Sequence, residues 1–562
     1  MTRWIFMFLF NALIALSRCS DITIAVFGKE LDRMPAAFGD FNSDELTDVF
    51  VLTKDAKTVQ IMLAYMEEPL LRPSEKYSCT FNKSKITSVV PGDFDGDVFM
   101  DIMITTVNKA NDTTFINVYI LWGGKDELQC ADESKPLLIM AHEPLAMDYN
   151  QDMIVDLFGT DQNNERMFWV FNVNKTAPTP IPMKAPAKGL DLNHDFYADL
   201  VITTEKYLEI WHGKENGFEY YKKIPTDFVV VGQSLYLDVE LLGRMDLVLP
   251  TCDDPLFKWY DLLVDFKSPT GETWGFVVGN GQRYTDTITM RGGDFNMDGY
   301  PDLLATLTYF NKTQSFLLEN VPCETLGGAL NRTFKVRWNA LYPFSNESAM
   351  AVFYDFYQDG ILDVIFVLKD KDMYKTAAFK NSLDYDANFV KVMVLTGRTN
   401  SKYPISPGTL GQKKRTYGTN LPGPSISYKT TTQDGNNRHA LAAQLPQSAH
   451  FSLHLPYTTF GLGRTPNFVD LLTVGLANKS REYPQIIPNS QMVVIPNPLS
   501  DSSRWKAQLY LTPSKLILLS AAALSATCGL ITAIIASLYW KERREDKIER
   551  LQEAHRFHFD AM

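Results

Sequence analysis

The pattern that decides the fold of this chain is clearest in the stretch Gly292-Gly293-Asp294-Phe295-Asn296-Met297-Asp298-Gly299-Tyr300-Pro301-Asp302. Counted from Asp294, oxygen-bearing side chains stand at positions one, three, five and nine, and an aliphatic segment follows directly. Successive copies start 43 residues apart at the closest (148 to 191) and 61 at the widest (294 to 355). Such periods are typical of propeller blades with four short strands. The seven copies therefore predict a seven-bladed β-propeller over residues 21–385, and they begin at Asp40, Asp93, Asp148, Asp191, Asp238, Asp294 and Asp355.

Five copies keep all four oxygen-bearing side chains. Calcium takes about six to eight oxygen ligands, and a nine-residue loop of this kind can surround one ion, with the carbonyl of position seven as a further ligand. Asp and Asn are also frequent in ordinary turns, but five copies at blade-like spacing favour structural Ca²⁺. The predicted ligands are Asp40, Asn42, Asp44, Asp48, Asp93, Asp95, Asp97, Asp101, Asp148, Asn150, Asp152, Asp156, Asp191, Asn193, Asp195, Asp199, Asp294, Asn296, Asp298 and Asp302.

Two copies lack one of these oxygens. The fifth copy has Leu242 at position five, and the seventh has Tyr357 at position three. We therefore do not include these two copies among the predicted calcium loops. The residues that they retain are Asp238, Glu240 and Asp246 in the fifth copy, and Asp355, Asp359 and Asp363 in the seventh.

Three of the copies also resemble a known repeat. The stretches Phe38-Gly39-Asp40-Phe41-Asn42, Pro91-Gly92-Asp93-Phe94-Asp95-Gly96 and Gly292 to Gly299 are similar to the FG-GAP repeats of integrin α chains. The resemblance implies that the calcium loops lie on the face opposite the ligand face, and that the ions stiffen the blades without taking part in catalysis. We expect Ile22 to Phe27 to form an extra strand that closes the ring against the last blade.

The acidic repeat stops after the seventh copy, and residues 386–500 have the composition of a small β-sandwich-like module. Asn388 to Leu395 alternates as a strand, and Phe460 to Gly463 follows after a stretch rich in Gly, Pro and Thr. His450 and His454 would be about 13 Å apart on a strand, which argues against a metal pair. Residues 501–515 are predicted to be a stalk.

The two ends of the chain predict a single-pass type I membrane protein. Residues 1–20 have the short apolar core of a secretory signal. Residues 516–540 carry no charge and are long enough to span a bilayer. Because Lys541, Arg543 and Arg544 follow at once, the positive-inside rule places the tail, residues 541–562, in the cytoplasm. The expected location is therefore the plasma membrane, with an extracellular ectodomain.

Sequons and cysteines agree with this topology. Sequons for N-glycosylation lie at Asn82, Asn111, Asn174, Asn311, Asn331, Asn346 and Asn478, all before the span. Cys79, Cys130, Cys252 and Cys323 form an even set in an oxidising compartment. Proximity in the sequence favours Cys79–Cys130 and Cys252–Cys323, although four cysteines allow three pairings.

The whole arrangement resembles the T-cell immunomodulatory protein family, also called linkin. The resemblance covers the full length, and its most specific element is the tail ending Glu553-Ala554-His555-Arg556-Phe557-His558-Phe559-Asp560-Ala561-Met562. It implies cell-surface adhesion and modulation of T-cell function, with a protein partner at the cell surface.

Other function classes fit the sequence less well. A net charge of −12 argues against nucleic acid as a partner. No metalloprotease, nucleophile-elbow or P-loop pattern occurs, so we expect neither an enzyme nor a small-molecule substrate. Two alternatives stay open, a trafficking or assembly adaptor that binds a cytoplasmic protein through its tail, and a propeller enzyme.

Overall fold

The fold is taken from a computed structural model of the chain. It describes residues 21–110, 113–124, 127–183, 196–204, 207–215, 217–225, 230–252, 266–276, 288–310, 312–323, 331–342, 344, 348–370, 373–382, 387–399, 417–432, 435–447, 451–464, 468–512 and 515–559. The predicted signal, residues 1–20, lies outside the described residues. The chain divides into two compact units, Met1–Leu511 and Thr512–Met562.

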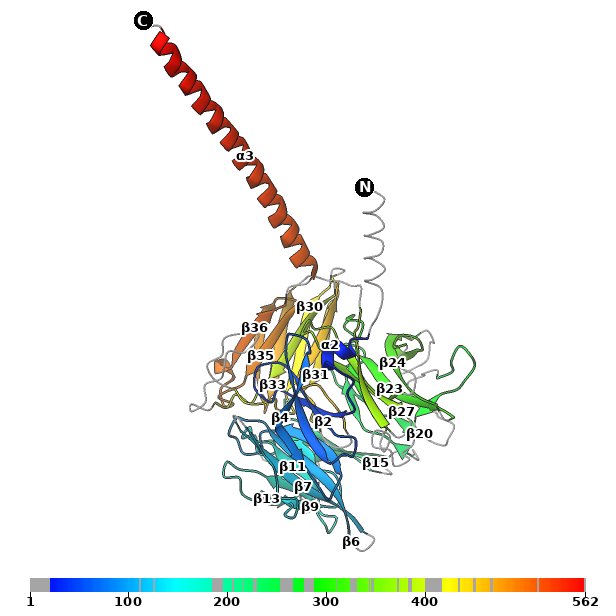
Figure 1. Cartoon of the computed structure of the whole chain (residues 1–562). Coiled ribbons are helices and arrows are strands. Elements are labelled where there is room, and N and C mark those ends of the chain that lie inside the picture. The colour runs from blue at the N-terminus through cyan, green and yellow to red at the C-terminus, as the bar shows by residue number, and fades with distance from the viewer. Residues whose placement is uncertain are drawn as a thin grey trace. The chain divides into compact units, whose positions relative to one another are not determined.

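Residues 21–382, the repeat region, form a series of antiparallel sheets that follow the chain (Figure 1). The first three sheets contain β1 (Met34–Gly39), β2 (Asp48–Leu52), β3 (Thr58–Ala64) and β4 (Leu71–Thr80); β5 (Ile86–Gly92), β6 (Asp101–Ala110), β7 (Thr113–Gly123), β8 (Leu128–Gln129) and β9 (Leu138–Met140); and β10 (Leu145–Met147), β11 (Asp156–Thr160), β12 (Arg166–Val170) and β13 (Thr179–Pro182).

The later part of the repeat region continues in the same way. It contains β14 (Leu200–Thr203), β15 (Tyr207–Lys214) and β16 (Gly217–Pro225); the pairs β17 (Val230–Val231) with β20 (Thr251–Cys252) and β18 (Leu235–Leu237) with β19 (Asp246–Val248); β21 (Gly275–Phe276), β22 (Met290–Gly293), β23 (Asp302–Tyr309), β24 (Lys312–Pro322) and β25 (Arg332–Arg337); and β26 (Ser348–Tyr354), β27 (Asp363–Asp370) and β28 (Met373–Phe379).

Two strands of these sheets, β2 and β26, are buried along their whole length. All five residues of β2 and all seven of β26 are buried, because neighbouring sheets pack on each side. Phe38 of β1, Val89 of β5 and Val352 of β26 share one core, which joins the first, second and last sheets of the repeat region. The region is therefore all-β, and its closure into a seven-bladed ring stays a prediction.

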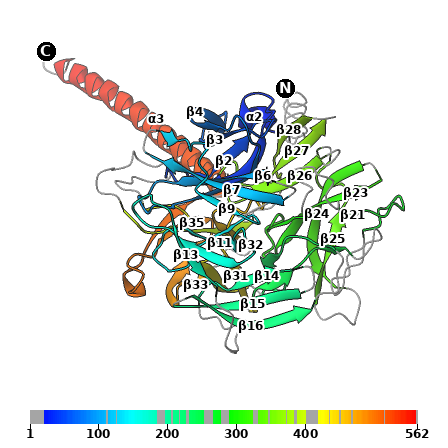
Figure 2. The ribbon, with the colours of Figure 1, turned by 90° about the horizontal axis from the view of Figure 1, so that it is seen from below.

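The N-terminal segment packs against the last of these sheets, but not as the expected strand. Residues Thr23–Phe27 form a short helix, α2, so the prediction of a strand from Ile22 to Phe27 is wrong. The predicted neighbour is correct, because the Ile22 N–H donates to the carbonyl of Ala378 in β28 at 3.0 Å. Figure 2 shows β2 to β4 beside β26 to β28, and the Tyr354 hydroxyl donates to the carbonyl of Thr47.

The second module, Asn388–Leu511, consists of two four-stranded sheets that share one core. The parallel pairing of β29 with β35 is the one parallel strand pair among the described strands. Val392, Met492 and Val494 of the first sheet meet Ile426, Leu472 and Val474 of the second. The strands are β29 (Asn388–Val394), β32 (Thr458–Gly463), β35 (Ser490–Ile495) and β36 (Lys506–Leu511) in one sheet, and β30 (Ser425–Thr431), β31 (Asn437–Ala443), β33 (Val469–Leu476) and β34 (Lys479–Ile486) in the other.

Two predictions about this module need correction. The predicted stalk, residues 501–515, begins with a 3₁₀ turn, η1 (Ser502–Arg504), and continues as β36, which pairs with β35. The module therefore ends near Leu511 and not at residue 500. The described part of the expected strand from His450 to His454, residues 451–454, is not a strand, and Phe451 and Leu453 take positive φ angles of 55°.

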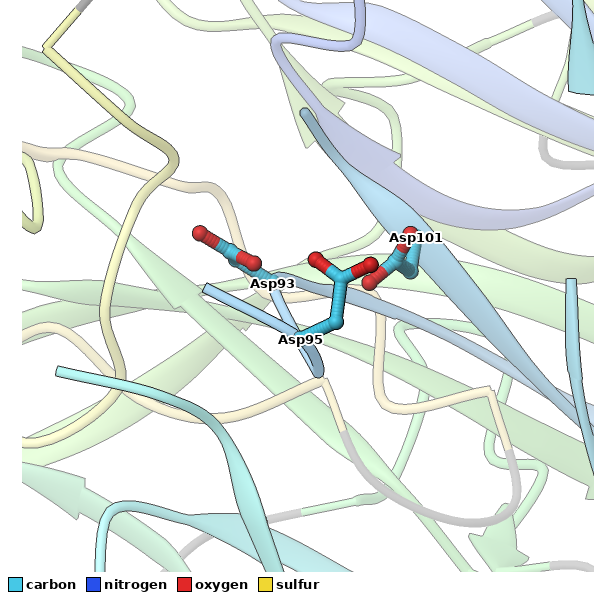
Figure 3. A group of neighbouring side chains, drawn as sticks. All are labelled: Asp93, Asp95 and Asp101. Carbon is cyan, nitrogen blue, oxygen red and sulfur yellow. The ribbon is translucent and has the colours of Figure 1, made fainter. Parts of the chain in front are cut away.

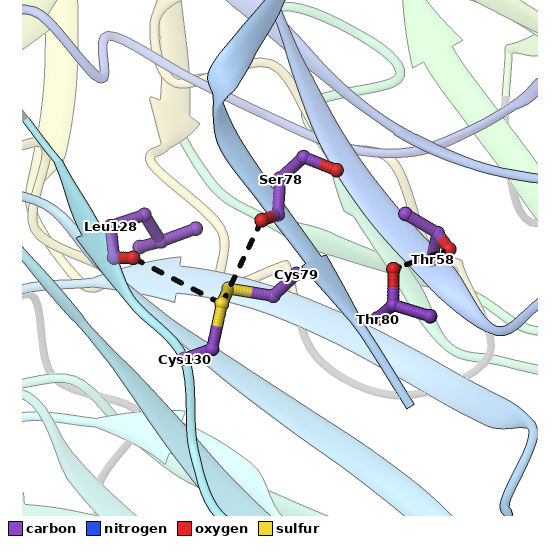
Figure 4. Close-up of a disulfide and its surroundings, with 6 residues drawn as sticks. All are labelled: Thr58, Ser78, Cys79, Thr80, Leu128 and Cys130. Carbon is purple, nitrogen blue, oxygen red and sulfur yellow. Dashed lines mark hydrogen bonds between the residues drawn. A yellow bond between two sulfur atoms is a disulfide. The ribbon is translucent and has the colours of Figure 1, made fainter. Parts of the chain in front are cut away.

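The predicted disulfide Cys79–Cys130 is confirmed (Figure 4). It joins β4 of the first sheet to the residue that follows β8 of the second, with the two Cα atoms 5.5 Å apart. Closing a loop of 51 residues restricts the unfolded chain and stabilises the fold by about 4 kcal/mol in the chain-entropy treatment. The side chain of Cys252 lies outside the described residues, so Cys252–Cys323 stays a prediction.

The second unit contains one long helix, α3 (Lys515–Phe559). Its stretch Leu519–Glu553 is long and apolar enough to cross a membrane, with a mean hydropathy of 1.9 in the best window. The predicted span, residues 516–540, lies within this helix, and the basic cluster and most of the predicted tail continue it without a break. The helix fits a single-pass membrane protein.

Candidate cation-binding loops

Six of the acidic loops each connect two neighbouring antiparallel strands of one sheet. In six of the copies, the residue before the first acid pairs with the last acid across two antiparallel strands, as Gly92 pairs with Asp101. The other five pairs are Gly39 with Asp48, Met147 with Asp156, Leu237 with Asp246, Gly293 with Asp302 and Tyr354 with Asp363. Each loop is therefore a nine-residue turn whose ends are fixed by the sheet.

Backbone N–H groups hold the carboxylates of the second loop in place. The Phe94 and Gly123 N–H groups donate to the two carboxylate oxygens of Asp101, at 2.9 and 2.7 Å. Asp93 accepts from Gly96 at 2.6 Å and from Val98 at 3.1 Å. Gly96 and Val98 both take positive φ angles, which turn their N–H groups inward. The loop thus folds around its acids, and backbone hydrogen bonds fix the positions of the carboxylates.

Three acids of this loop form a compact group. Asp93, Asp95 and Asp101 each offer one carboxylate oxygen, and these oxygens lie within 4.8 Å of one another. Figure 3 shows the carboxylate of Asp95 between those of Asp93 and Asp101. All three side chains are buried, with exposed fractions of 0–1%. Three buried oxygens at this spacing suit a hard cation such as Ca²⁺.

The raised pKa values of these acids reflect their burial and mutual repulsion, which a bound cation would offset. Burial raises the pKa of Asp93 to about 8, and the neighbouring carboxylates of Asp95 and Asp97 add to the rise. Burial and the same kind of repulsion raise the pKa of Asp97 to about 6 and that of Asp101 well above its usual range. A cation among them would reverse this repulsion, because it favours the charged form of every ligand.

A lysine lies beside the second loop. The Lys175 ammonium is 2.7 Å from Oδ2 of Asp95 and 3.5 Å from Oδ2 of Asp97. Its Nζ also lies 5.2 Å from the centre of the Trp122 ring. Because Lys175 is 40% exposed, water screens this pair, and the ammonium can leave without being buried elsewhere.

The first, third and sixth loops repeat this construction. Asp40, Asp148 and Asp294 each accept from the N–H groups of positions five and six. The last acid of each loop accepts from position two and from a residue in or just after a neighbouring strand. Asn42, Asn150 and Asn296 each donate to the acid two residues later. Burial raises the pKa of Asp148 and Asp294 to about 7 and that of Asp156 to about 8.

The fourth loop is described only at its end. Asp191, Asn193 and Asp195 lie outside the described residues, so their ligand set stays a prediction. Asp199 accepts from the Gly213 N–H at 2.9 Å and lies 3.1 Å from Nδ1 of His212.

The two incomplete loops are contacted by the second module. In the fifth, Asp238 accepts the N–H of Leu441 in β31 at 3.0 Å. In the seventh, the ammonium of Lys391 in β29 lies 3.2 Å from Oδ2 of Asp355. The sequence reasoning missed Lys391, although a lysine among the apolar residues Phe389 to Leu395 was a usable signal.

The second module also contacts the remaining loops. Arg398 donates to the carbonyls of Gly96 and Asp152, in the second and third loops. The Tyr510 hydroxyl donates to Glu45 in the first, and the Gly461 N–H donates to Asp294 in the sixth. In the fourth, a β-carbon at Gly475 would lie 1.9 Å from the Phe196 ring, so the two segments touch. All seven loops therefore meet the second module.

A cavity of about 140 Å³ lies beside the fifth and sixth loops, against the second module. Its lining is mostly apolar and includes Tyr236, Arg291 and His454. Burial lowers the pKa of His454 to about 4, and the charge of Arg291 adds to this effect. His454 is thus a neutral side chain at the edge of a cavity.

Four predicted glycosylation sites, Asn82, Asn174, Asn331 and Asn478, are exposed, as glycan attachment requires. Asn111, Asn311 and Asn346 lie outside the described residues.

Comparison with known proteins shows which family the chain resembles. The family model described as "ITFG1, C2 domain" matches residues 416–510, within the second module. A human relative named "T-cell immunomodulatory protein" is 39% identical, covering 96% of this chain and 94% of the relative. "Protein linkin" of Caenorhabditis elegans is 27% identical, covering 94% of this chain and 95% of the relative.

The chain is thus a protein with a large all-β region and, among the described residues, one helix suited to a single membrane crossing. More particularly, it belongs to the T-cell immunomodulatory protein family, as the resemblance of its sequence predicted. Its relatives are named as immunomodulatory proteins and not as enzymes.

Proposed function

We propose that this chain is a cell-surface type I membrane glycoprotein that acts by binding a protein partner, in adhesion or as a modulator of T-cell function, and not by catalysis. The observation that carries the proposal is the 39% identity to a human T-cell immunomodulatory protein over 96% of this chain. The apolar helix α3 and the exposed sequons support the membrane and extracellular parts of it.

The repeat region is proposed to be a seven-bladed propeller with Ca²⁺ in its intact loops. The side chains present fit the ion, because Asp93, Asp95 and Asp101 converge within 4.8 Å and are buried. The residues that would hold ions are the oxygen-bearing side chains of loops one, two, three, four and six. Bound calcium would supply positive charge that offsets carboxylate repulsion, and it would stiffen the loops.

The position of the second module limits where a partner can bind. It touches all seven loops, through contacts such as Arg398 to Gly96 and Gly461 to Asp294. The loop ends of the sheets are therefore covered within the chain itself. We propose that the opposite ends of the sheets form the face that receives a protein partner, in line with the FG-GAP resemblance.

The experiment uses the full-length chain displayed on cells that lack it. Surface biotinylation and glycosidase treatment test whether sequon-bearing parts are extracellular. Proximity labelling from the N-terminal side of the mature chain, with and without extracellular calcium, should then enrich surface proteins. A chain that stays unglycosylated and inaccessible to biotin would contradict the proposed topology.

The alternative, an adaptor that works through its tail, is favoured by one observation. Helix α3 continues to Phe559, so the tail is presented as an extended helix and not as a loose end. Deletion of residues 550–562 separates the two ideas. If surface labelling is unchanged while intracellular complexes disappear, the tail has a separate role, and if neither changes, the adaptor idea fails.

A further inference from the structure

A buried lysine of the second module reaches into the seventh acidic loop. Lys391 lies in β29 between Val390 and Val392, and its side chain is 1% exposed. Its ammonium is 3.2 Å from Oδ2 of Asp355 and donates to Oε1 of Gln358 at 2.7 Å. The same Nζ lies 3.9 Å from the centre of the Tyr457 ring. The ammonium therefore contacts a carboxylate, an amide oxygen and an aromatic ring.

Burying an ammonium is unfavourable unless other groups replace its water shell. Here the Asp355 carboxylate, which is itself 0% exposed on its side chain, provides the opposite charge. The Gln358 amide provides an oxygen, and the face of Tyr457 stabilises a cation electrostatically. Gln358 is held by its own bond to the Asp355 carbonyl at 3.2 Å. These contacts form a complete binding site for one cation.

The loop that receives this ammonium has the same backbone scaffold as the predicted calcium loops. Asp355 accepts from the N–H groups of Asp359 and Gly360, just as Asp294 accepts from those of Asp298 and Gly299. The loop scaffold is thus the same. The difference lies at position three, where the seventh copy has Tyr357 in place of an oxygen ligand. The seventh loop therefore lacks one metal ligand and contacts the ammonium of Lys391 instead.

We propose that the Lys391 ammonium is the resident cation of the seventh loop. The loop consequently binds no divalent metal, and it ties the second module to the repeat region whether or not calcium is bound elsewhere. This inference goes beyond the proposed function, and it does not depend on calcium in the other loops.

A double-mutant cycle on the full-length chain in detergent micelles tests the pairing. The variants are Lys391→Met, Asp355→Asn and the two together, and the measurement is the melting temperature with excess chelator. Each single variant should melt at a lower temperature than the parent. The decrease in the double variant should be smaller than the sum of the two single decreases, because neither charge is then left buried alone. Additive losses, or a Lys391→Met variant that melts like the parent, would overturn the proposal.

Counting bound calcium by elemental analysis tests the exclusion of metal. Asp355→Asn should leave the number of calcium ions per chain unchanged, whereas the matched variant Asp294→Asn should lower it by one. A loss of one ion in Asp355→Asn would overturn the inference. If no variant or parent binds calcium, the calcium part of the proposed function fails, and the cycle alone decides the role of Lys391.

If Lys391→Met does not fold, Gln358→Met replaces it in the cycle with Asp355→Asn. This variant keeps the charges and removes one oxygen from the ammonium, so it should lower the melting temperature less than Asp355→Asn does. An unchanged melting temperature for Gln358→Met would count against the site.

Discussion

The second loop, from Asp93 to Asp101, and the seventh, from Asp355 to Asp363, share the backbone hydrogen bonds that fix their ends. In each, the first acid accepts from position six, and the last acid accepts from position two and from a residue in or just after a neighbouring strand. Their surroundings differ. The second loop collects three buried carboxylate oxygens beside a half-exposed lysine, and the seventh receives a fully buried lysine from another module.

This difference shows that the shape of a loop and the cation beside it have separate causes. The scaffold of each loop depends on bonds between carboxylates and N–H groups within the motif and its own sheet. The identity of the cation depends on side chains that the fold brings from elsewhere, such as Lys391, which lies 36 residues from Asp355 in the chain. A loop can therefore keep its shape and exchange a metal for an ammonium.

Calcium removal should have the largest effect on this comparison. With about 1 mM calcium and a dissociation constant of about 10⁻⁴ M, each filled loop gains about 1.4 kcal/mol by mass action, or about 7 kcal/mol for five loops. We expect the ectodomain of the full-length chain to melt at a clearly lower temperature with chelator. The control is magnesium at equal ionic strength, which should not restore the loss. An unchanged melting temperature, with no calcium found by elemental analysis, would contradict the proposed calcium sites.

Substituting the last acid of the second and seventh loops by alanine tests whether the two loops differ in calcium binding. Asp101 and Asp363 are both buried and each accepts two backbone N–H groups, so Asp101→Ala and Asp363→Ala should each cost about 2–4 kcal/mol. The two variants should differ in their response to calcium, measured as the rise in melting temperature. The rise should be smaller in Asp101→Ala and unchanged in Asp363→Ala. An equal reduction in both would mean that the seventh loop also binds an ion.

The all-β class, the acidic turns and the Cys79–Cys130 bridge could be predicted from the sequence, because each depends on local spacing or on proximity in the chain. The helix α2 could not be predicted, because Thr23–Phe27 is rich in apolar and β-branched residues, which favour a strand. Its position depends on contacts with β28, which is distant in the sequence. The cover over the loops could not be predicted either. Arg398, Arg438 and Lys391 reach the loops only through the packing of two modules.

The pH dependence of the calcium-free protein tests the charge state of an ion loop. Burial raises the pKa of Asp294 to about 7 from the usual value near 4, so the folded state holds this proton more tightly than the unfolded state. The resulting stability is fully present below about pH 4 and is lost as the pH rises through about 7. Between pH 5.5 and 7.0, this carboxyl alone should lower the free energy of unfolding by about 1.6 kcal/mol.

The measurement is the melting temperature of the chelated chain at both pH values, for the parent and for Asp294→Asn. The variant should show a weaker fall with pH. With calcium present, the parent should instead gain stability as the pH rises, because the ion needs deprotonated ligands. A parent that becomes more stable with pH even in chelator would contradict the raised pKa.

The smallest expected effect concerns the lysine of the second loop, which differs from Lys391 in being exposed to water. Lys175 lies 2.7 Å from Asp95, so calcium must displace it to reach that carboxylate. A pair that is 40% exposed on the lysine side contributes about 0.5–1 kcal/mol, so Lys175→Met should tighten calcium binding at this loop about 2- to 5-fold. The substitution leaves the sequon formed by Asn174 and Thr176 intact.

Trp122 provides the signal for this titration, because its ring lies 5.2 Å from the Lys175 ammonium. Its fluorescence should change as calcium replaces the ammonium, and the change should be reduced in Lys175→Met, so bound calcium is measured independently by equilibrium dialysis. Lys175→Arg keeps the charge and should bind calcium like the parent. If Lys175→Met binds calcium no better than Lys175→Arg, then the exposed lysine does not compete with the ion.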